Sequence, residues 1–396
     1  MKRQPDRGAD LTIALNYYAP YVSGLTDTAK VVAEGLADRG WRVTVIAARH
    51  DRSLPVSERL AGVDVIRTPV VARIGKGTIS PQLPFVAARA ARQASVLNLH
   101  MPMLEAGMIS RLARNTPLVA TYQCDVSLPP GIVNGVQVRA VDTSSRGALT
   151  RAQVVVPSSD DYARNSRLWT SMQGRTTVIS PPCLDRRGGK PTFRDGNGVH
   201  VGFLGRIVEE KGLEYLVEGF LRAAGQDDRL LIGGDYSKVA GGSVIDRVRA
   251  RAGGDARVRF LGFLPDGSLD DFYASLDVFA LPSVNSLEAF GIVQVEAMMT
   301  GVPAIATDIP GVRTPVQNTG FGVVVPPRDA SAIAAAITEL RDQPRDRELG
   351  GRLTRERYGV ISTINAYEAV FRELGASPGG AFGASSGDAD DRVADG

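Results

Sequence analysis

The stretch that decides the fold reads Glu288-Ala-Phe-Gly-Ile-Val-Gln-Val-Glu296-Ala-Met-Met-Thr-Gly-Val-Pro-Ala-Ile-Ala-Thr307. Phe290 and Gly291 mark a turn into a helix, and a Gly-Val-Pro stop then leads into an apolar strand. The first free backbone N–H groups of that helix, around Ile292 and Val293, carry the positive end of the helix dipole. Because such a helix start attracts anions, we expect a phosphate seat above Glu288.

The two carboxylates of this stretch, Glu288 and Glu296, lie eight residues apart. If every residue between them were helical, they would be roughly 12 Å apart at about 1.5 Å per residue. Carboxylate pairs that cleave glycosidic bonds lie about 5 to 9.5 Å apart, so a hydrolase dyad is disfavoured. We expect Glu288 to meet the polar end of a bound group and Glu296 to accept hydrogen bonds from sugar hydroxyls. The alternative is a helix-start carboxylate at 288 and a solvated helix face at 296.

Apolar runs alternate with helical segments along the rest of the chain. A strand over 11–18, a loop with Gly24, a helical segment over 28–39 and a strand over 41–47 form a βαβ unit. Further strands are predicted at 63–67, 96–100, 117–121, 153–156, 200–205, 230–235, 258–264, 277–282 and 320–327. This alternation predicts parallel sheets that bind ligands at the carboxyl ends of their strands. The Gly24 loop lacks a G-x-G-x-x-G pattern, which disfavours a dinucleotide, and a plain turn glycine is the alternative.

Ionisable side chains stand at the ends of two predicted strands. His100 ends one strand, where an imidazole suits hydrogen bonding to a sugar hydroxyl, although a lone histidine is often structural. Arg206 and Lys211 follow the strand over 200–205. An arginine fork and a lysine point charge can together clamp a diphosphate. The alternative is surface ion pairing with the neighbouring Glu209 and Glu210.

The stretch over 288–296 resembles the Glu-x7-Glu signature of the retaining glycosyltransferases of family GT4. The segment over 201–212, Val-Gly-Phe-Leu-Gly-Arg-Ile-Val-Glu-Glu-Lys-Gly, is similar to that family's Gly-Arg…Lys-Gly segment, and the strand over 276–283 is similar to the one before its signature. The likeness extends to about residue 374. It implies the α/β GT-B fold, in which two Rossmann-like domains with parallel sheets face each other across a cleft.

The resemblance also implies roles for individual residues. Catalytic roles fall to Arg206 and Lys211 at the leaving diphosphate, Glu288 at the transferred sugar and His100 at a sugar hydroxyl. Donor binding falls to Glu296 at the ribose, Gly24 and the turn Phe290, Gly291, Ile292 and Val293 at the diphosphate, and Gly262 and Phe263 beside the nucleobase. Leu25 stands where relatives often have a second glycine, and Gln123 where they often have a histidine. Asp125 is a weaker acceptor-side candidate.

The length of 396 residues predicts two domains. We expect an acceptor-binding domain over 1–185, a breaker-rich hinge over 186–198, a nucleotide-sugar-binding domain over 199–354, a helix over 355–374 that crosses back to the first domain, and a disordered tail over 375–396. Two cysteines and three histidines show no metal-ligand spacing, so no metal is expected. The polar start and the short apolar run after it predict a cytoplasmic protein.

Charge is divided unevenly along the chain. Residues 1–190 carry 25 Lys and Arg against 14 Asp and Glu, whereas residues 191–396 carry 21 against 29. A basic first half suits an anionic partner, either a membrane surface with peripheral association or a phosphorylated acceptor. The basic segments over 71–77 and 89–92 are candidates for that contact, with solvated loops as the alternative. Nucleic acid is disfavoured because no basic helix carries interleaved aromatic residues.

The sequence therefore predicts a retaining glycosyltransferase. Its donor would be a nucleoside-diphosphate sugar, with UDP as the first choice and GDP as the second, by family frequency. Its acceptor would be a hydroxyl of a lipid-linked intermediate, a polysaccharide precursor or a natural product. Three alternatives stay open: a glycan phosphorylase, a two-domain sugar-binding protein of the periplasmic kind, and a catalytically silent nucleotide-sugar-binding protein.

Overall fold

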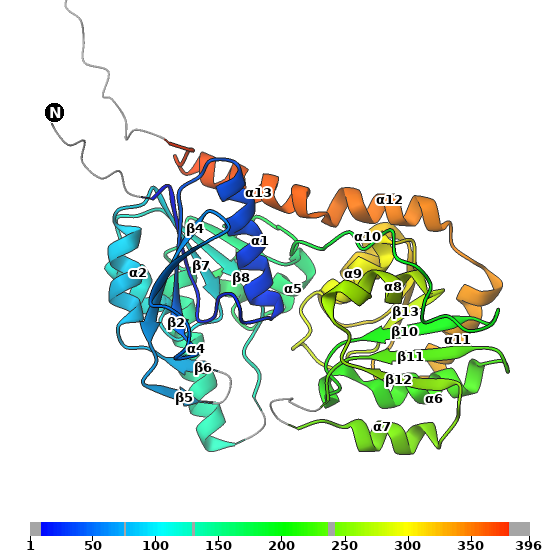
Figure 1. Ribbon diagram of the computed structural model, residues 1–396. Coiled ribbons are helices and arrows are strands. Elements are labelled where there is room, and N and C mark those ends of the chain that lie inside the picture. Colours follow the sequence, from blue (N-terminus) through cyan, green and yellow to red (C-terminus); the bar gives the residue numbers. More distant parts are fainter. Residues whose placement is uncertain (1–8, 75–76, 129–130, 237–241, 380–396) are drawn as a thin grey trace, which may run out of the picture.

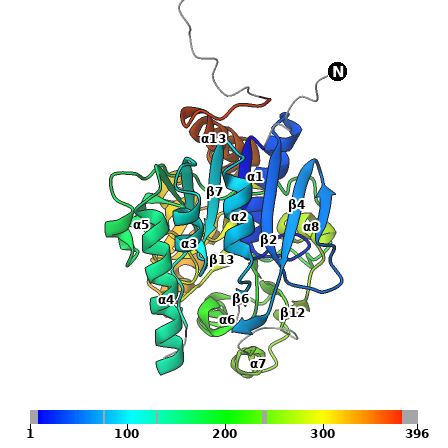
Figure 2. The same cartoon turned by 90° about the vertical axis from the view of Figure 1, so that its left-hand side faces the viewer.

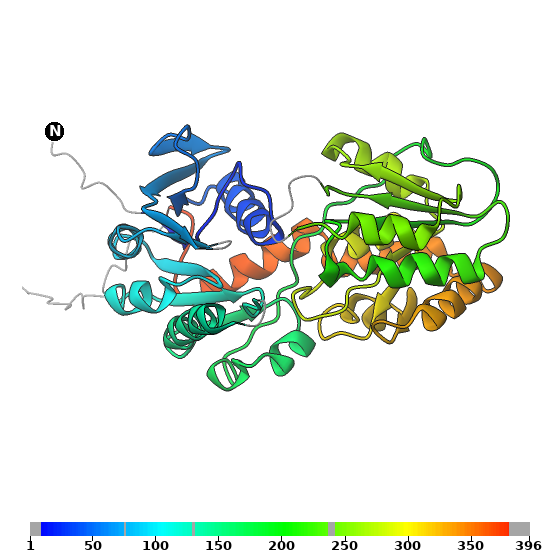
Figure 3. The same ribbon diagram turned by 90° about the horizontal axis from the view of Figure 1, so that it is seen from below.

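The computed structural model describes residues 9–74, 77–128, 131–236 and 242–379. Two α/β domains lie side by side, and two long helices at the C-terminal end run along both of them (Figure 1). Seen from below, the two domains lie next to each other (Figure 3), and the start of α1 (Gly24–Asp38) comes close to the second domain. Both domains have the mostly parallel sheets that the strand and helix alternation predicts.

The first domain is built on a seven-stranded sheet of order β3-β4-β2-β1-β7-β8-β9. Its strands are β1 (Leu11–Ala14), β2 (Val43–Arg49), β3 (Ser57–Leu60), β4 (Val63–Pro69), β7 (Val96–Met101), β8 (Leu118–Tyr122) and β9 (Val154–Pro157). Only β3 is antiparallel to its neighbour within this sheet. The helices are α1 (Gly24–Asp38), α2 (Leu83–Ala91), α3 (Ala106–Leu112), α4 (Ile132–Leu149) and α5 (Asp160–Asn165), with a short hairpin of β5 (Ala72–Ile74) and β6 (Gly77–Ile79).

The second domain is built on a six-stranded sheet of order β12-β11-β10-β13-β14-β15, in which all pairs are parallel. Its strands are β10 (His200–Leu204), β11 (Arg229–Gly233), β12 (Val258–Gly262), β13 (Val278–Leu281), β14 (Ala304–Thr307) and β15 (Gly322–Val325). Its helices are α6 (Leu213–Ala223), α7 (Ile245–Ala252), α8 (Leu269–Ala274), α9 (Ile292–Met299), α10 (Thr314–Thr319) and α11 (Ala330–Asp342).

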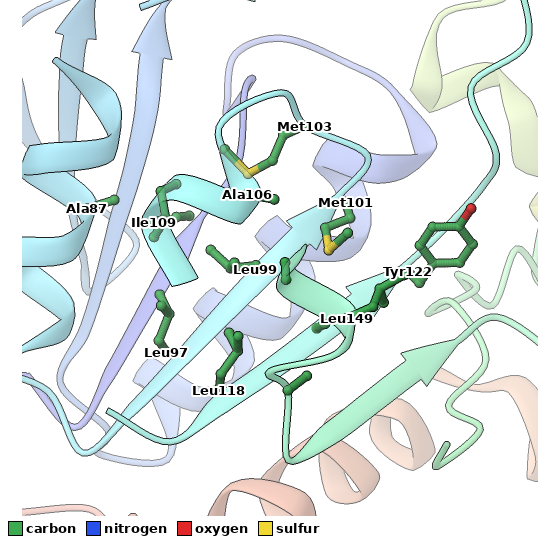
Figure 4. Close-up of a cluster of buried hydrophobic side chains, with 14 of the residues drawn as sticks. Ala87, Leu97, Leu99, Met101, Met103, Ala106, Ile109, Leu118, Tyr122 and Leu149 are labelled. Carbon is green, nitrogen blue, oxygen red and sulfur yellow. The ribbon is translucent and has the colours of Figure 1, made fainter. Parts of the chain in front are cut away.

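Each sheet has a hydrophobic core on both faces. In the first domain, α2, α3 and the end of α4 pack on one face and α1 on the other. Figure 4 shows part of the first core, where Leu97, Leu99 and Met101 of β7 lie near Ile109 of α3. Every residue of β7 is buried, as expected for a parallel strand covered on both faces. A sheet buried in this way leaves the loops at its strand ends as the place for ligands.

The C-terminal helices connect the domains. The sequence pattern predicts one helix over 355–374, whereas the structure has α12 (Arg347–Tyr358) and α13 (Val360–Glu373), which meet at an extended Gly359. Helix α12 packs on α9, so residues 355–358 belong with the second domain. Helix α13 packs on α1, with Ile364, Tyr367 and Phe371 in the core of the first domain. The break arises because Gly359 leaves the helical conformation just where the chain changes domain.

The linker over 186–198 also differs from the expected hinge. Its backbone is fixed to the second domain, since Lys190 N–H donates to Asp271 and Phe193 N–H donates to Ser275. The chain crosses earlier, where Cys183 N–H donates to the Tyr358 carbonyl over 3.2 Å. The two crossings therefore lie side by side at Cys183 and Gly359. Glycines and prolines in 186–198 mark an irregular segment, but hydrogen bonds to α8 hold it in place. Of the expected disordered tail, residues 380–396 lie outside the described residues.

Candidate active site

The start of α9 is shaped by a glycine. Gly291 has a φ of +81°, and a Cβ atom built there would lie 2.3 Å from Leu281 Cδ2. Only glycine therefore fits this turn without displacing its neighbours. The buried Gln294 side chain donates to the Phe290 and Val312 carbonyls, both over 2.8 Å, and fixes the chain before the helix. Gln294 was not predicted as a buried residue of the site, because a glutamine in an amphipathic stretch gives no local signal of burial.

Lys211 and Glu288 meet at this helix start. Their side chains form an ion pair, and they are only 14% and 18% exposed. The backbone just after Lys211 packs closely on Pro282, because a Cβ atom on Gly212 would lie 2.1 Å from the Pro282 carbonyl oxygen. Glycine at position 212 therefore allows the chain to place Lys211 here. Arg206 is 46% exposed and pairs with Glu210 over 3.3 Å. This contact is the surface ion pair that was the alternative to a diphosphate clamp. The structure thus brings Lys211 and Glu288 together and leaves Arg206 at the rim.

The first helix of the other domain approaches the same place. Helix α1 begins at Gly24, with Ser23 as its N-cap accepting from Thr26 N–H. A Cβ atom built on Gly24 would lie 3.6 Å from Ile292 Cδ1 in α9. The starts of two helices, one from each domain, therefore lie close together. Both helix dipoles add positive potential to the space between the domains.

His100 lies at the end of β7 and is completely buried. Burial lowers its pKa to about 3, so the ring is neutral at pH 7. The Gln123 amide nitrogen contacts His100 Nδ1 at 3.3 Å and the Leu25 carbonyl at 3.4 Å. Because a carbonyl can only accept, this nitrogen donates to both, and the His100 proton is on Nε2. Nε2 has no partner within the described residues, which leaves a buried donor ready for a ligand oxygen.

This contact joins the two positions that depart from the GT4 pattern. Gln123 takes the place at which relatives often carry a histidine, and it bonds to the carbonyl of Leu25, the site of the absent second glycine. The pair therefore orients His100 in this chain. Asp125, the weaker acceptor-side candidate, accepts instead from Tyr122 and from Ser166 and pairs with Arg167, in a network within the first domain.

Glu296 is buried in α9, with 6% of its surface exposed, so it is not a solvated face residue. Its carboxylate accepts from Tyr273 over 3.2 Å and from Leu184 N–H over 3.4 Å, and Arg186 Nε lies 3.6 Å away. Burial raises the Glu296 pKa, and the charge of Arg186 opposes that rise. Arg186 was not predicted as a site residue, because its surroundings in the sequence are rich in glycine and proline and indicate only a linker.

The two candidates beside the nucleobase follow β12. Gly262 has a φ of +72°, and Phe263 is 71% exposed. Arg186 connects this loop to Glu296, because it also reaches Asp266 over 2.6 Å and Asp270 over 3.5 Å. Arg186 therefore links the segment after β12 to Glu296.

Within the described ranges, no group of three His, Cys, Asp or Glu side chains is arranged to hold a metal ion. None of the helices described is both long enough and apolar enough to span a membrane.

Two parallel-sheet domains with these groups at their facing edges define a GT-B glycosyltransferase fold. The chain resembles the structure of HepE from Anabaena in complex with UDP, with a TM-score of 0.69, 18% identity and coverage of 92% of this chain and 100% of that chain. A likeness at this identity supports the fold alone.

Sequence comparison supplies the family. The model described as "Glycosyl transferase 4-like domain" matches residues 23–182, and "Glycosyl transferases group 1" matches residues 198–343. The chain is 29% identical to a GDP-mannose-dependent alpha-mannosyltransferase of Mycolicibacterium smegmatis over 89% of this chain and 91% of that protein. It is 27% identical to a 2-deoxystreptamine glucosyltransferase of Streptomyces kanamyceticus over 63% and 69%. The chain belongs to the group 1 glycosyltransferases and transfers sugar from a nucleotide sugar.

Proposed function

We propose that this enzyme transfers a hexosyl group from a UDP-sugar, with retention of anomeric configuration, to a hydroxyl of an acceptor in the first domain. A GDP-sugar is the second candidate for the donor. The observation that carries the proposal is the approach of the α1 start to the α9 start, which the largely buried Lys211–Glu288 pair adjoins. A diphosphate leaving an anomeric carbon gains negative charge, and this place offers fixed positive charge to it.

Each group has a task in this proposal. Lys211 and the N–H groups at the α9 start stabilise the departing diphosphate. Arg206, at the rim of the site, donates hydrogen bonds to the outer oxygens of the diphosphate. Glu288 holds Lys211 in position and balances charge beside the transferred sugar. His100 Nε2–H donates to a sugar hydroxyl, because a buried donor without a partner gains most from a new acceptor. Since side chains and amides supply this charge, we propose that catalysis needs no bound metal.

Glu296 is proposed to bind the donor ribose. A carboxylate accepts hydrogen bonds from both hydroxyls of a diol, and Glu296 lies next to the loop with Gly262 and Phe263. Arg186 now occupies one side of that carboxylate. We therefore propose that donor binding shifts Arg186 toward Asp266 and Asp270, its other partners. Closure of the domains about the paired crossings at Cys183 and Gly359 would then exclude water from the donor.

The nucleobase can be decided by a binding panel. UDP is favoured by the UDP named for the similar structure, and GDP by the donor named for the mannosyltransferase relative. A donor at 100 times its Kd should raise the free energy of unfolding by about 2.7 kcal/mol, which a thermal shift assay detects. Failure of every UDP and GDP compound to bind would refute the proposal. Proton NMR of the product anomer tests retention.

A catalytically silent binding protein is the second candidate, and one observation favours it. The Gln123–Leu25 contact replaces family features beside His100. Donor binding without turnover, across a panel that includes amphiphilic and aminocyclitol acceptors, would support the silent protein. Release of UDP or GDP that depends on acceptor would exclude it.

A further inference from the structure

Next to the donor groups, the first domain contains an apolar cavity of about 480 Å³. It lies between the loops after β1, β7 and β8 and one side of α4, and its lining includes Leu25, Met103, Val136 and Val141. A volume of this size fits a small ring system or a segment of an aliphatic chain. None of the donor-binding roles above requires it. The cavity is therefore available to the acceptor.

A second hollow, which we call the arginine pocket, lies after β2 and β4 and has a volume of about 470 Å³. Its charged lining is Arg49, Arg52 and Arg73 against Asp51. Arg49 and Arg73 donate to backbone carbonyls, and none of the three arginines forms a salt bridge in the described parts of the chain. Asp51 accepts from Ser53. Three guanidinium groups and one carboxylate leave two positive charges in excess.

Aromatic rings from the linings of the two hollows contact one another. Tyr17 and Tyr21 line the apolar cavity and stack at 4.3 Å, and the His50 ring of the arginine pocket lies 5.7 Å and 5.4 Å from them. Burial is the main cause that lowers the His50 pKa, so this ring adds no charge at pH 7. The linings of the two hollows are therefore neighbours in space, so a single molecule that lies over these rings can reach both hollows.

The apolar surface continues outward along α4, which forms an outer edge of the first domain (Figure 2). Val136 lines the cavity and is 59% exposed, and one turn earlier Ile132 and Val133 are 90% and 69% exposed. Adjacent exposed apolar side chains at the mouth of a cavity favour an aliphatic chain longer than the cavity itself. A compact natural product would not need this surface.

We propose that the acceptor is a phosphate-bearing lipid whose phosphate binds the arginine pocket and whose apolar chain fills the apolar cavity and leaves along α4. A phosphate monoester carries a charge of about −1.5 to −2 at pH 7, which matches the two excess positive charges. Arginine forks suit phosphate oxygens. This inference rests on the proposed function, because it assigns the acceptor of that reaction.

Calorimetric titration of the full-length chain with octyl phosphate, octyl glucoside and inorganic phosphate, each below its aggregation threshold, tests the inference. Octyl phosphate should bind at least about tenfold more tightly than either control, since only it contacts both hollows. The double variant Arg52→Ala, Arg73→Ala should bind octyl phosphate about ten- to a hundredfold more weakly. This is the loss of affinity expected when a charge-assisted hydrogen bond is removed. The matched control Arg111→Ala, Arg114→Ala, two exposed residues at the end of α3 and just after it, should lose none.

The apolar half is tested with Val136→Asp, an exposed site where a new charge should leave the fold intact. This variant should weaken octyl phosphate and leave inorganic phosphate unchanged. Equal affinity for octyl phosphate and octyl glucoside would overturn the inference in favour of a neutral acceptor. Inorganic phosphate that binds as tightly as octyl phosphate would overturn it in favour of a small phosphorylated acceptor. Titration of UDP and GDP in parallel keeps the two proposals distinct, because their binding does not depend on either hollow.

Discussion

Replacing Lys211 with alanine removes the cation nearest the start of α9. Its side chain is 14% exposed and ion-paired with Glu288, so it acts where water screens little. Removal of one preorganised group that stabilises a leaving group typically costs about 2.7 to 4 kcal/mol, which is about 10² to 10³ in kcat. Arg206 is 46% exposed, and its loss should cost less, about tenfold, because solvent screens it.

The assay is steady-state release of nucleoside diphosphate from the donor that the thermal shift panel identifies. Lys211→Ala should lower kcat far more than it raises the KM for donor, since the charge on the diphosphate grows in the transition state. Retention of kcat within about threefold of wild type would refute the reasoning, because that loss is below 1 kcal/mol.

A double-mutant cycle isolates the role of Glu288. If Glu288 acts only by holding Lys211, the double variant Lys211→Ala, Glu288→Gln should be no slower than Lys211→Ala alone. A further loss in the double variant would give Glu288 a task of its own at the transferred sugar. Thermal unfolding of each variant controls for damage to the fold, because both side chains are largely buried.

The remaining predictions concern His100, Glu296 and the C-terminal helix. His100 has a folded pKa lowered to about 3, so its contribution to stability is complete above its unfolded pKa of about 6.5 and is lost as pH falls toward 3. Between pH 7 and pH 5.5, the free energy of unfolding of wild type should fall by about 1 kcal/mol more than that of His100→Asn in urea titrations, and an equal fall in both would contradict the buried neutral ring. Glu296→Gln should weaken binding of a ribonucleoside diphosphate about tenfold, as expected for loss of a charged hydrogen-bond acceptor, and leave its 2′,3′-dideoxy analogue nearly unchanged in calorimetry. If both nucleotides weaken equally, Glu296 does not read the ribose. Phe371→Ala, in the fully buried part of α13, should destabilise the protein by about 3 to 5 kcal/mol, whereas the matched exposed change Ile361→Ala should cost little in the same denaturation assay.

The local pattern around residue 288 predicts much of the site. The helix start at Gly291 and the strand up to Thr307 follow from glycine, proline and apolar spacing, and both are present. The two domains and the parallel sheets likewise follow from the alternation of strand-like and helical segments. These features depend on neighbours within a few residues, which the sequence displays directly.

Contacts between segments that are far apart in the sequence could not be predicted from such local patterns. Arg186 reaches Glu296 from a linker that the sequence pattern predicts as a hinge, and Gln123, after β8, bonds to Leu25 at the start of α1. The helix break at Gly359 was missed because glycine at a helix end and glycine within a helix look alike when the packing of each half is unknown. Each outcome depends on which surface the segment packs against.

Local patterns of spacing predict most of the strands and helices, their order and the chemistry available at their ends, because helix and strand formation follow short-range rules. Which of those groups meet depends on the tertiary structure. It buried Glu296, paired Lys211 with Glu288 and, among the residues that the structure describes, left His100 Nε2 without a partner. It also gathered Arg49 from the end of β2, Arg52 from the loop after it and Arg73 from β5 into one pocket. The physical reason is that burial and charge pairing depend on distances through space, which strand order and domain packing set.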